Sequence, residues 1–194
     1  MLRALLWLLT FARVFLIPLF LHAGLTAQEL ARSGDDPSTS KLIALALMFT
    51  MGVTDLLDGW VARRFDLTSQ IGAVFDAVAD KLVQVALVAF FTLSVGPVFT
   101  ALPLWFLVIV FGRDLVLLVG VSLLRIQYGP LQVVHRIHGR IASVLMFVVL
   151  GWSALGLPMW GLMPLMIGAA GVSVYSATIY ALDGASQGRA MSEG

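Results

Sequence analysis

The sequence predicts an all-α integral membrane protein with six transmembrane helices and both termini in the cytoplasm. Of the 194 residues, 60% are hydrophobic and only 12% are charged, about half the charged fraction of a soluble domain. Mean hydropathy is +0.98, and at about 20 residues a crossing, about six crossings account for most of the chain. The composition excludes disordered, coiled-coil and nucleic-acid-binding chains. The absence of cysteine excludes disulfides and thiolate metal sites.

Polar or helix-breaking residues divide the chain into its expected elements. The first span covers residues 2–25, and the polar segment 28–41 that follows it is expected to be a solvated loop. The second span starts at residue 42 and runs into the charged stretch 55–66, and the third covers residues 71–95. The fourth covers 101–124, and the uncharged stretch 141–182, broken at residues 156–158, predicts a hairpin of spans five and six. We expect residues 1–194 to form a single membrane domain.

The distribution of basic residues predicts the orientation. With six spans, Arg3, the Arg63-Arg64 pair, the basic segment 125–140 and Arg189 all fall on one side of the membrane. The turns on the other side are uncharged or carry more acid than base. Because cytoplasmic loops are enriched in lysine and arginine, this side is the cytoplasm.

Four acids stand at the cytoplasmic ends of spans two and three. Residues three or four apart share a helical face. Asp55 and Asp58 therefore lie on one face of their helix, and Asp76 and Asp80 lie on one face of theirs. If the two helices run antiparallel, all four carboxylates can converge, and they would repel one another unless cations neutralised them. Oxygen ligands select hard divalent ions such as Mg²⁺ or Mn²⁺. The alternative is that the acids form structural ion pairs with Arg63, Arg64, Lys81 and Arg113.

The neighbours of these acids complete a longer pattern. It reads Asp55-x-x-Asp58-Gly59-x-x-Ala62-Arg63, eight residues, then Gly72-x-x-x-Asp76-x-x-x-Asp80. Chance agreement at eight fixed positions is on the order of 10⁻⁹ per starting residue. The pattern matches the signature of the CDP-alcohol phosphatidyltransferases without a spacing error. The segments Leu9-Thr10-x-x-Arg13 and Gly112-Arg113-Asp114 also resemble the phosphatidylglycerophosphate synthase branch, and Ala79-Asp80-Lys81 is similar to that branch and to the cardiolipin synthases.

This resemblance implies a metal-dependent enzyme of phospholipid synthesis in a bacterial-type inner membrane, with its active site facing the cytoplasm. Two ions, Mg²⁺ or Mn²⁺, would be held by Asp55, Asp58 and Asp76, with Asp80 assisting and acting as the general base. The nucleotide of CDP-diacylglycerol would contact the residues between these acids, namely Gly59, Ala62, Arg63 and Gly72. The two glycines also have a packing interpretation, since small residues let membrane helices approach closely. A homodimer is implied as well.

The acceptor alcohol is predicted from basic residues outside the motif. Arg113 and Arg140 would suit a phosphate at the cytoplasmic side, which favours glycerol 3-phosphate; phosphatidylglycerol, giving cardiolipin, is the alternative. Arg13 lies mid-span and is expected to face the polar site near a phosphate, or else to pair with an aspartate. Arg113 could likewise form only an ion pair with Asp114. The segment 138–143 departs from the pattern of the glycerophosphate enzymes by lacking a second lysine and a downstream glutamine, which leaves the acceptor open.

A second class of function is a small cation transporter or channel whose aspartates line the ion path. Acids inside membrane spans often mark such paths. An ion path must cross the whole membrane, however, whereas these acids cluster at one face and the opposite half of the chain is nearly uncharged. The sequence therefore favours the enzyme.

Overall fold

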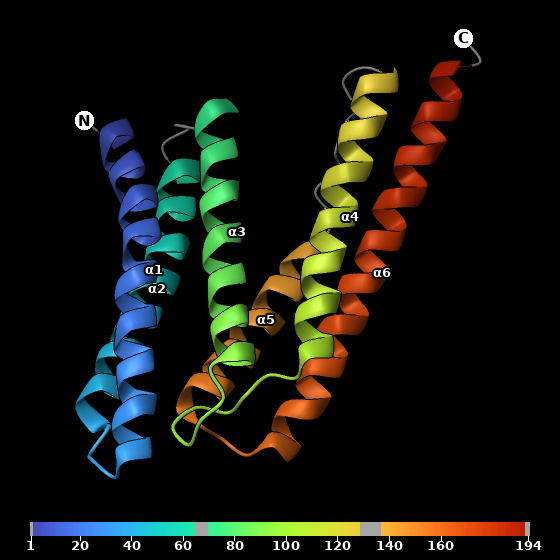
Figure 1. Ribbon diagram of the computed structural model, residues 1–194. Coiled ribbons are helices and arrows are strands. Elements are labelled where there is room, and N and C mark those ends of the chain that lie inside the picture. The colour runs from blue at the N-terminus through green and yellow to red at the C-terminus, as the bar shows by residue number, and fades with distance from the viewer. Residues whose placement is uncertain (1, 65–69, 129–136, 193–194) are drawn as a thin grey trace. The chain divides into compact units, whose positions relative to one another are not determined.

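The structure is a computed structural model, which describes the backbone of residues 2–64, 70–128 and 137–192. Within these ranges, side chains are described for residues 8, 10–55, 57, 72, 75–116, 118–120 and 144–179. All regular structure in the described residues is α-helical (Figure 1). The helices are α1 (Leu2–Ser33), α2 (Ser38–Arg64), α3 (Gln70–Leu93), α4 (Leu104–Tyr128), α5 (Ile137–Leu155) and α6 (Met159–Ser192).

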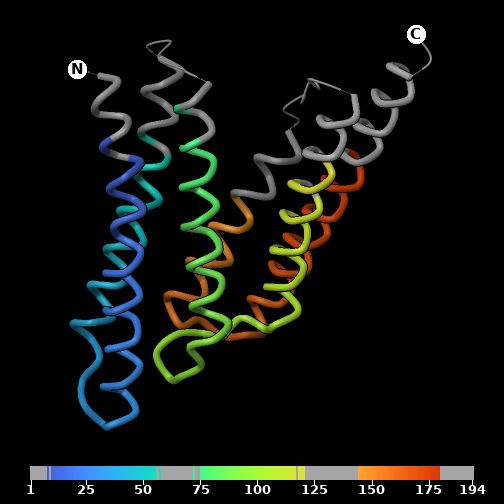
Figure 2. The backbone as a smooth tube through the Cα atoms, turned by 45° about the horizontal axis from the view of Figure 1, so that its top comes forward, coloured from blue at the N-terminus to red at the C-terminus, as the bar shows by residue number. Residues whose placement is uncertain are grey.

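The predicted all-helical class is confirmed, but the predicted loop at residues 28–41 is wrong at both ends. Helix α1 continues to Ser33, and only residues 34–37 separate it from α2 (Figure 2). Gly34 ends α1 with φ 87°, and the Asp35 amide donates to the Leu30 carbonyl at 2.9 Å, which is a Schellman C-cap. Local capping stops a helix here, whereas polar composition alone does not.

The predicted break at residues 156–158 is confirmed and has the same geometry. Gly156 has φ 73°, and the Leu157 amide donates to the Trp152 carbonyl. Pro158 follows, and the next helix begins at Met159. Glycine supplies the left-handed conformation that other residues adopt only with strain.

The described chain divides into two compact units. Unit 1 contains residues 1–101 and 154–156, and unit 2 contains residues 102–153 and 157–194. In unit 1, α2 and α3 both pack on α1 (Figure 1). In unit 2, α4 packs along α6 around the buried side chains of Phe106, Leu162 and Met166.

The core of unit 1 is an aromatic cluster that joins α1 to α3 and to the segment after α3. Phe20 of α1 packs edge-on against Phe90 at a centroid distance of 5.0 Å, and Phe91 contacts Phe99 at 5.7 Å. A Cβ atom at Gly24 would lie 2.5 Å from the Phe90 ring, so this glycine permits the close approach of α1 and α3. The cluster fixes α3, which carries Asp76 and Asp80, against α1.

Two helical segments in the described chain are long and apolar enough to cross a bilayer, Thr10–Ser33 and Met159–Ile179. Large apolar side chains are also exposed outside these segments, including Val108, Val116 and Leu118 on α4. Exposed apolar surface of this extent indicates contact with a nonaqueous environment or a partner. The number of crossings and the side of each terminus stay predictions.

Candidate active site

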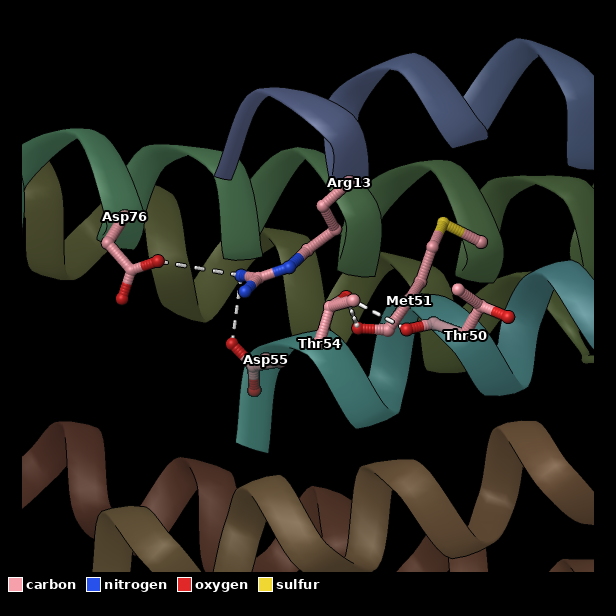
Figure 3. A network of polar contacts seen from close by, with 6 residues as sticks. All are labelled: Arg13, Thr50, Met51, Thr54, Asp55 and Asp76. Carbon is pink, nitrogen blue, oxygen red and sulfur yellow. Dashed lines mark hydrogen bonds and ion pairs between the residues drawn. The ribbon is translucent and has the colours of Figure 1, made fainter. Parts of the chain in front are cut away.

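Arg13 of α1 joins two acids of the motif that lie on different helices. Its Nη1 atom is 2.9 Å from Asp55 Oδ1 on α2 and 3.6 Å from Asp76 Oδ1 on α3. Figure 3 shows the guanidinium between the two carboxylates. The prediction that spans two and three bring acids together is thus supported for this pair, which is 21 residues apart in sequence.

The burial of the three groups is unequal. The Arg13 side chain is only 1% exposed, whereas those of Asp55 and Asp76 are each 43% exposed. A buried arginine is costly unless it is paired, because charge loses its hydration in an apolar environment. The two carboxylates therefore stabilise Arg13 in its position while keeping open faces themselves.

The polar side chains beside Asp55 on α2 are engaged with their own helix. Thr54 donates its hydroxyl to the Thr50 carbonyl at 2.8 Å, and Thr50 donates to the Ala46 carbonyl at 2.8 Å (Figure 3 shows the first). Inside helices, a threonine hydroxyl often donates its hydrogen bond to the carbonyl four residues earlier. The chemistry of this part of α2 therefore rests on the carboxylate.

The described carboxylates suit a hard divalent cation in their chemistry. Asp76 Oδ1 is buried, and it accepts no hydrogen bond from the described residues. Its neighbouring cation, Arg13, lies at 3.6 Å and is shared with Asp55. Mg²⁺ and Mn²⁺ prefer oxygen ligands, and a carboxylate oxygen that can still accept a contact, next to a second carboxylate, is a ligand of this kind. The described side chains contain no group of three or more potential ligands, but the predicted ligand Asp58 is outside them.

The other motif residues are placed by the backbone. Asp58, Gly59, Ala62 and Arg63 lie on the last two turns of α2, and their side chains are outside the described residues. Gly72 lies in the first turn of α3, one turn before Asp76, and Asp80 follows one turn later with an exposed side chain. All the motif residues thus belong to two helices of unit 1.

The predicted acceptor residues have different surroundings. Arg13 pairs with aspartates, which is the second of the two positions predicted for it. Arg113 Nη1 contacts Asp114 Oδ1 at 3.0 Å within α4, so the predicted ion pair exists. Arg140 lies on α5, and its side chain is outside the described residues. Lys81, expected in the structural alternative to pair with an acid, donates to Gln84 Oε1 at 2.9 Å.

Sequence reasoning missed Gln28, which it placed in a loop. Gln28 is 1% exposed, donates to the Ser94 carbonyl at 2.9 Å and accepts from the Val98 amide at 3.1 Å. It ties α1 to the segment after α3 and helps to fix the helix that carries Arg13. Its position on the apolar helical face that contains Phe20 and Gly24 was the available signal.

Comparison with known proteins identifies the family. The profile described as CDP-alcohol phosphatidyltransferase matches residues 6–179, which is most of the chain. This chain belongs to the CDP-alcohol phosphatidyltransferase family. Members of this family are transferases. Membership therefore supports the interpretation as an enzyme over the interpretation as a cation transporter or channel. No solved structure matches the chain.

Curated members of the CDP-alcohol phosphatidyltransferase family resemble parts of the chain. A protein of Mycobacterium tuberculosis named probable phosphatidylglycerophosphate synthase is 32% identical over 120 residues, covering 61% of this chain and 50% of that protein. The CDP-diacylglycerol–glycerol-3-phosphate 3-phosphatidyltransferase of Haemophilus influenzae is 41% identical over 78 residues, covering 40% and 37%. The cardiolipin synthase (CMP-forming) of Streptomyces coelicolor is 35% identical over 127 residues, covering 65% and 54%. The matches thus span about half the length of these relatives or less.

Proposed function

We propose that this protein transfers the phosphatidyl group of CDP-diacylglycerol to glycerol 3-phosphate, giving phosphatidylglycerophosphate and CMP. The observation that carries the proposal is that Asp55 and Asp76 both contact Arg13. The chain is a member of this family, and all eight fixed positions of the motif are present. The names of the mycobacterial and Haemophilus relatives support glycerol 3-phosphate as the acceptor. The match to a cardiolipin synthase keeps phosphatidylglycerol as the second candidate.

In this proposal the reaction is a displacement at the phosphorus that carries diacylglycerol. The acceptor hydroxyl loses its proton to Asp80 as its oxygen forms the new phosphorus–oxygen bond. The bond from the same phosphorus to the bridging oxygen breaks, and CMP leaves with the electron pair. Asp55, Asp58 and Asp76, together with Asp80, would hold two ions, Mg²⁺ or Mn²⁺. Such ions neutralise the charge of the pyrophosphate and of the leaving phosphate.

The nucleotide and acceptor sites are part of the same proposal. Gly59, Ala62, Arg63 and Gly72 lie along the two motif helices and would contact the cytidine and its phosphates. Arg113 and Arg140 would bind the acceptor phosphate, since arginine forms strong paired hydrogen bonds with phosphate. Arg13 is proposed for the same phosphate-binding region because its guanidinium contacts Asp55 and Asp76, two carboxylates of the proposed metal site.

The molecular setting is proposed on separate grounds. Two segments are apolar enough to span a bilayer, and further apolar side chains are exposed, which supports integration in a membrane. We propose six crossings, cytoplasmic termini, and an active site at the cytoplasmic side of the inner membrane, as the arginine distribution indicates. The family profile covers residues 6–179, which supports a single membrane domain in residues 1–194. A homodimer is the proposed assembly.

The deciding experiment is CMP release by the purified protein in detergent. CDP-diacylglycerol and Mg²⁺ or Mn²⁺ are supplied with one acceptor at a time, and Asp76→Asn serves as the inactive control. Release with glycerol 3-phosphate supports the proposal, and release only with phosphatidylglycerol identifies a cardiolipin synthase. No release with any acceptor contradicts the proposed activity.

The acceptor site has its own test. Arg113→Ala and Arg140→Ala should each raise the KM for glycerol 3-phosphate far more than the KM for CDP-diacylglycerol, because each removes a phosphate contact. Arg32→Ala, an exposed arginine at the other end of α1, is the control and should change neither value. Equal effects on both substrates would show that these arginines do not select the acceptor.

A further inference from the structure

We propose that Arg13 is the resident counter-cation of Asp55 and Asp76. It neutralises part of their charge when no divalent ion is bound, and it competes with that ion for the same carboxylates. Arg13 is thus a positioning residue that sets how tightly the ion binds. This inference rests on the proposed function, which places a divalent ion at these acids.

The geometry gives one cation to two carboxylates. Nη1 of Arg13 is 2.9 Å from Asp55 Oδ1 and 3.6 Å from Asp76 Oδ1, so the same nitrogen faces both (Figure 3). Without a cation between them, two carboxylates at this spacing would repel each other and the ends of α2 and α3 would separate. Arg13 therefore keeps the pair assembled before an ion arrives.

The arginine of this group is buried, whereas its two carboxylates are partly exposed to an approaching ion. Arg13 is 1% exposed, whereas each carboxylate is 43% exposed. The described ion pairs of the two carboxylates share the single charge of Arg13, and Asp76 Oδ1 accepts no hydrogen bond from the described residues. The carboxylates therefore retain both charge and acceptor capacity for a second cation.

The two cations must oppose each other electrostatically. Each is attracted to the same oxygens, and two positive charges a few ångströms apart repel one another, most strongly where water is excluded. Removing Arg13 should therefore destabilise the ion-free protein more than the ion-bound protein. By linkage, the same removal must tighten ion binding.

Mn²⁺ binding by the purified full chain in detergent tests the inference. Free Mn²⁺ is measured by electron paramagnetic resonance, and the unfolding temperature is measured in EDTA and in saturating Mn²⁺. Arg13→Gln should unfold at a lower temperature than wild type in EDTA and should show a larger Mn²⁺-induced rise. It should bind Mn²⁺ about tenfold more tightly, which is within the usual range of coupling between two binding sites.

Two further variants control this experiment. Arg13→Lys keeps the charge but loses the planar fork that reaches two carboxylates, so its Mn²⁺ affinity should lie between those of wild type and Arg13→Gln. It carries the test alone if Arg13→Gln does not fold. Arg32→Gln removes an arginine of α1 that contacts the Val95 carbonyl rather than an acid, and it should bind Mn²⁺ as wild type does.

The outcomes separate this inference from the proposed function. Unchanged or weaker Mn²⁺ binding in the Arg13 variants overturns the counter-cation and leaves the proposed function standing. If wild type binds Mn²⁺ but releases no CMP with any acceptor, the activity is wrong, and the order of affinities still decides the role of Arg13. If wild type binds no Mn²⁺, the counter-cation inference is overturned, and CMP release with Mg²⁺ decides the proposed function separately.

Discussion

Asp80 differs from Asp55 and Asp76 in its surroundings. Its side chain is exposed, and the described ion pairs of Arg13 are with Asp55 and Asp76 instead. It follows Asp76 by four residues, so the two acids share a face of α3. An acid of the proposed site that Arg13 does not hold suits proton transfer better than the two acids that contact Arg13.

Replacing Asp80 by asparagine should therefore lower turnover by about 10²–10⁴-fold, the usual contribution of a general base. The amide keeps the size of the side chain and an oxygen, so binding of CDP-diacylglycerol should persist. CMP release and nucleotide binding, measured on the same preparation, check this. Asp35→Asn, which changes an exposed acid between α1 and α2, is the control, and wild-type turnover in Asp80→Asn would remove the proposed base.

Among the helices, α1 makes the contacts that hold unit 1 together. It carries Arg13 toward the acids and Phe20 into the aromatic cluster, and Gln28 ties it to the segment after α3. A Cβ atom at Gly96 would lie 2.2 Å from Gln28 Oε1, so the turn also packs closely on this side chain. The packing of one helix thus positions both the core and the site.

Gln28→Ala should destabilise the protein by on the order of 2 kcal/mol, because it leaves the buried Val98 amide without its acceptor. Thermal unfolding in detergent, followed by circular dichroism, measures the effect. Glu29→Ala changes the exposed neighbour on the same helix and should have little effect. Equal unfolding temperatures for the two variants would contradict the structural role of Gln28.

The start of α2 depends on pH through Asp36. The Ser38 hydroxyl and the Ser38 amide, at 3.0 Å, both donate to Asp36 Oδ1. These bonds lower the pKa of Asp36 below its ordinary value of 3.8, since they favour the ionised form. The stabilisation is therefore present above pH 3.8 and is lost as the pH falls through the lowered folded-state pKa.

Asp36→Asn should reveal this dependence because asparagine does not titrate. The difference in unfolding temperature between wild type and Asp36→Asn should shrink as the pH falls below the ordinary aspartate value. Thermal unfolding at a series of acidic pH values measures it, with Asp35→Asn as the neighbouring control. A difference that stays constant with pH would show that the Asp36 contacts do not stabilise the fold.

At the scale of the whole molecule, the motif acids belong entirely to unit 1, whereas Arg113 belongs to unit 2. The carboxylates of the proposed chemistry therefore all lie within one packed group of helices. The proposed acceptor residues Arg113 and Arg140 lie on α4 and α5. Substitution of the motif acids should therefore lower turnover, whereas substitution of Arg113 or Arg140 should mainly raise the acceptor KM.

The proposed topology can be tested directly because the natural chain has no cysteine. Thr39→Cys lies in the exposed start of α2, and Ser192→Cys lies at the end of α6. With six crossings and cytoplasmic termini, a membrane-impermeant maleimide should label only Thr39→Cys in intact cells and both variants after permeabilisation. Labelling of Ser192→Cys in intact cells would contradict cytoplasmic termini.

The helical class, the break at residues 156–158 and the family all follow from the sequence alone. Hydrophobic composition, a glycine suited to a left-handed turn and a motif with fixed spacing are all local properties. Spacing alone also places Asp55 and Asp58 on one helical face, and Asp76 and Asp80 on one face of the next helix. These features need no knowledge of what packs against what.

The acids that Arg13 contacts and the end of α1 depend instead on tertiary contacts. Arg13 lies 42 residues from Asp55 and 63 from Asp76, and no local rule selects partners at that separation. The polar residues 28–33 looked like a loop, but Gln28 finds hydrogen-bond partners after α3 that let the helix continue. Both outcomes depend on contacts between segments distant in sequence, because a buried polar group is stable only where the fold supplies its partner.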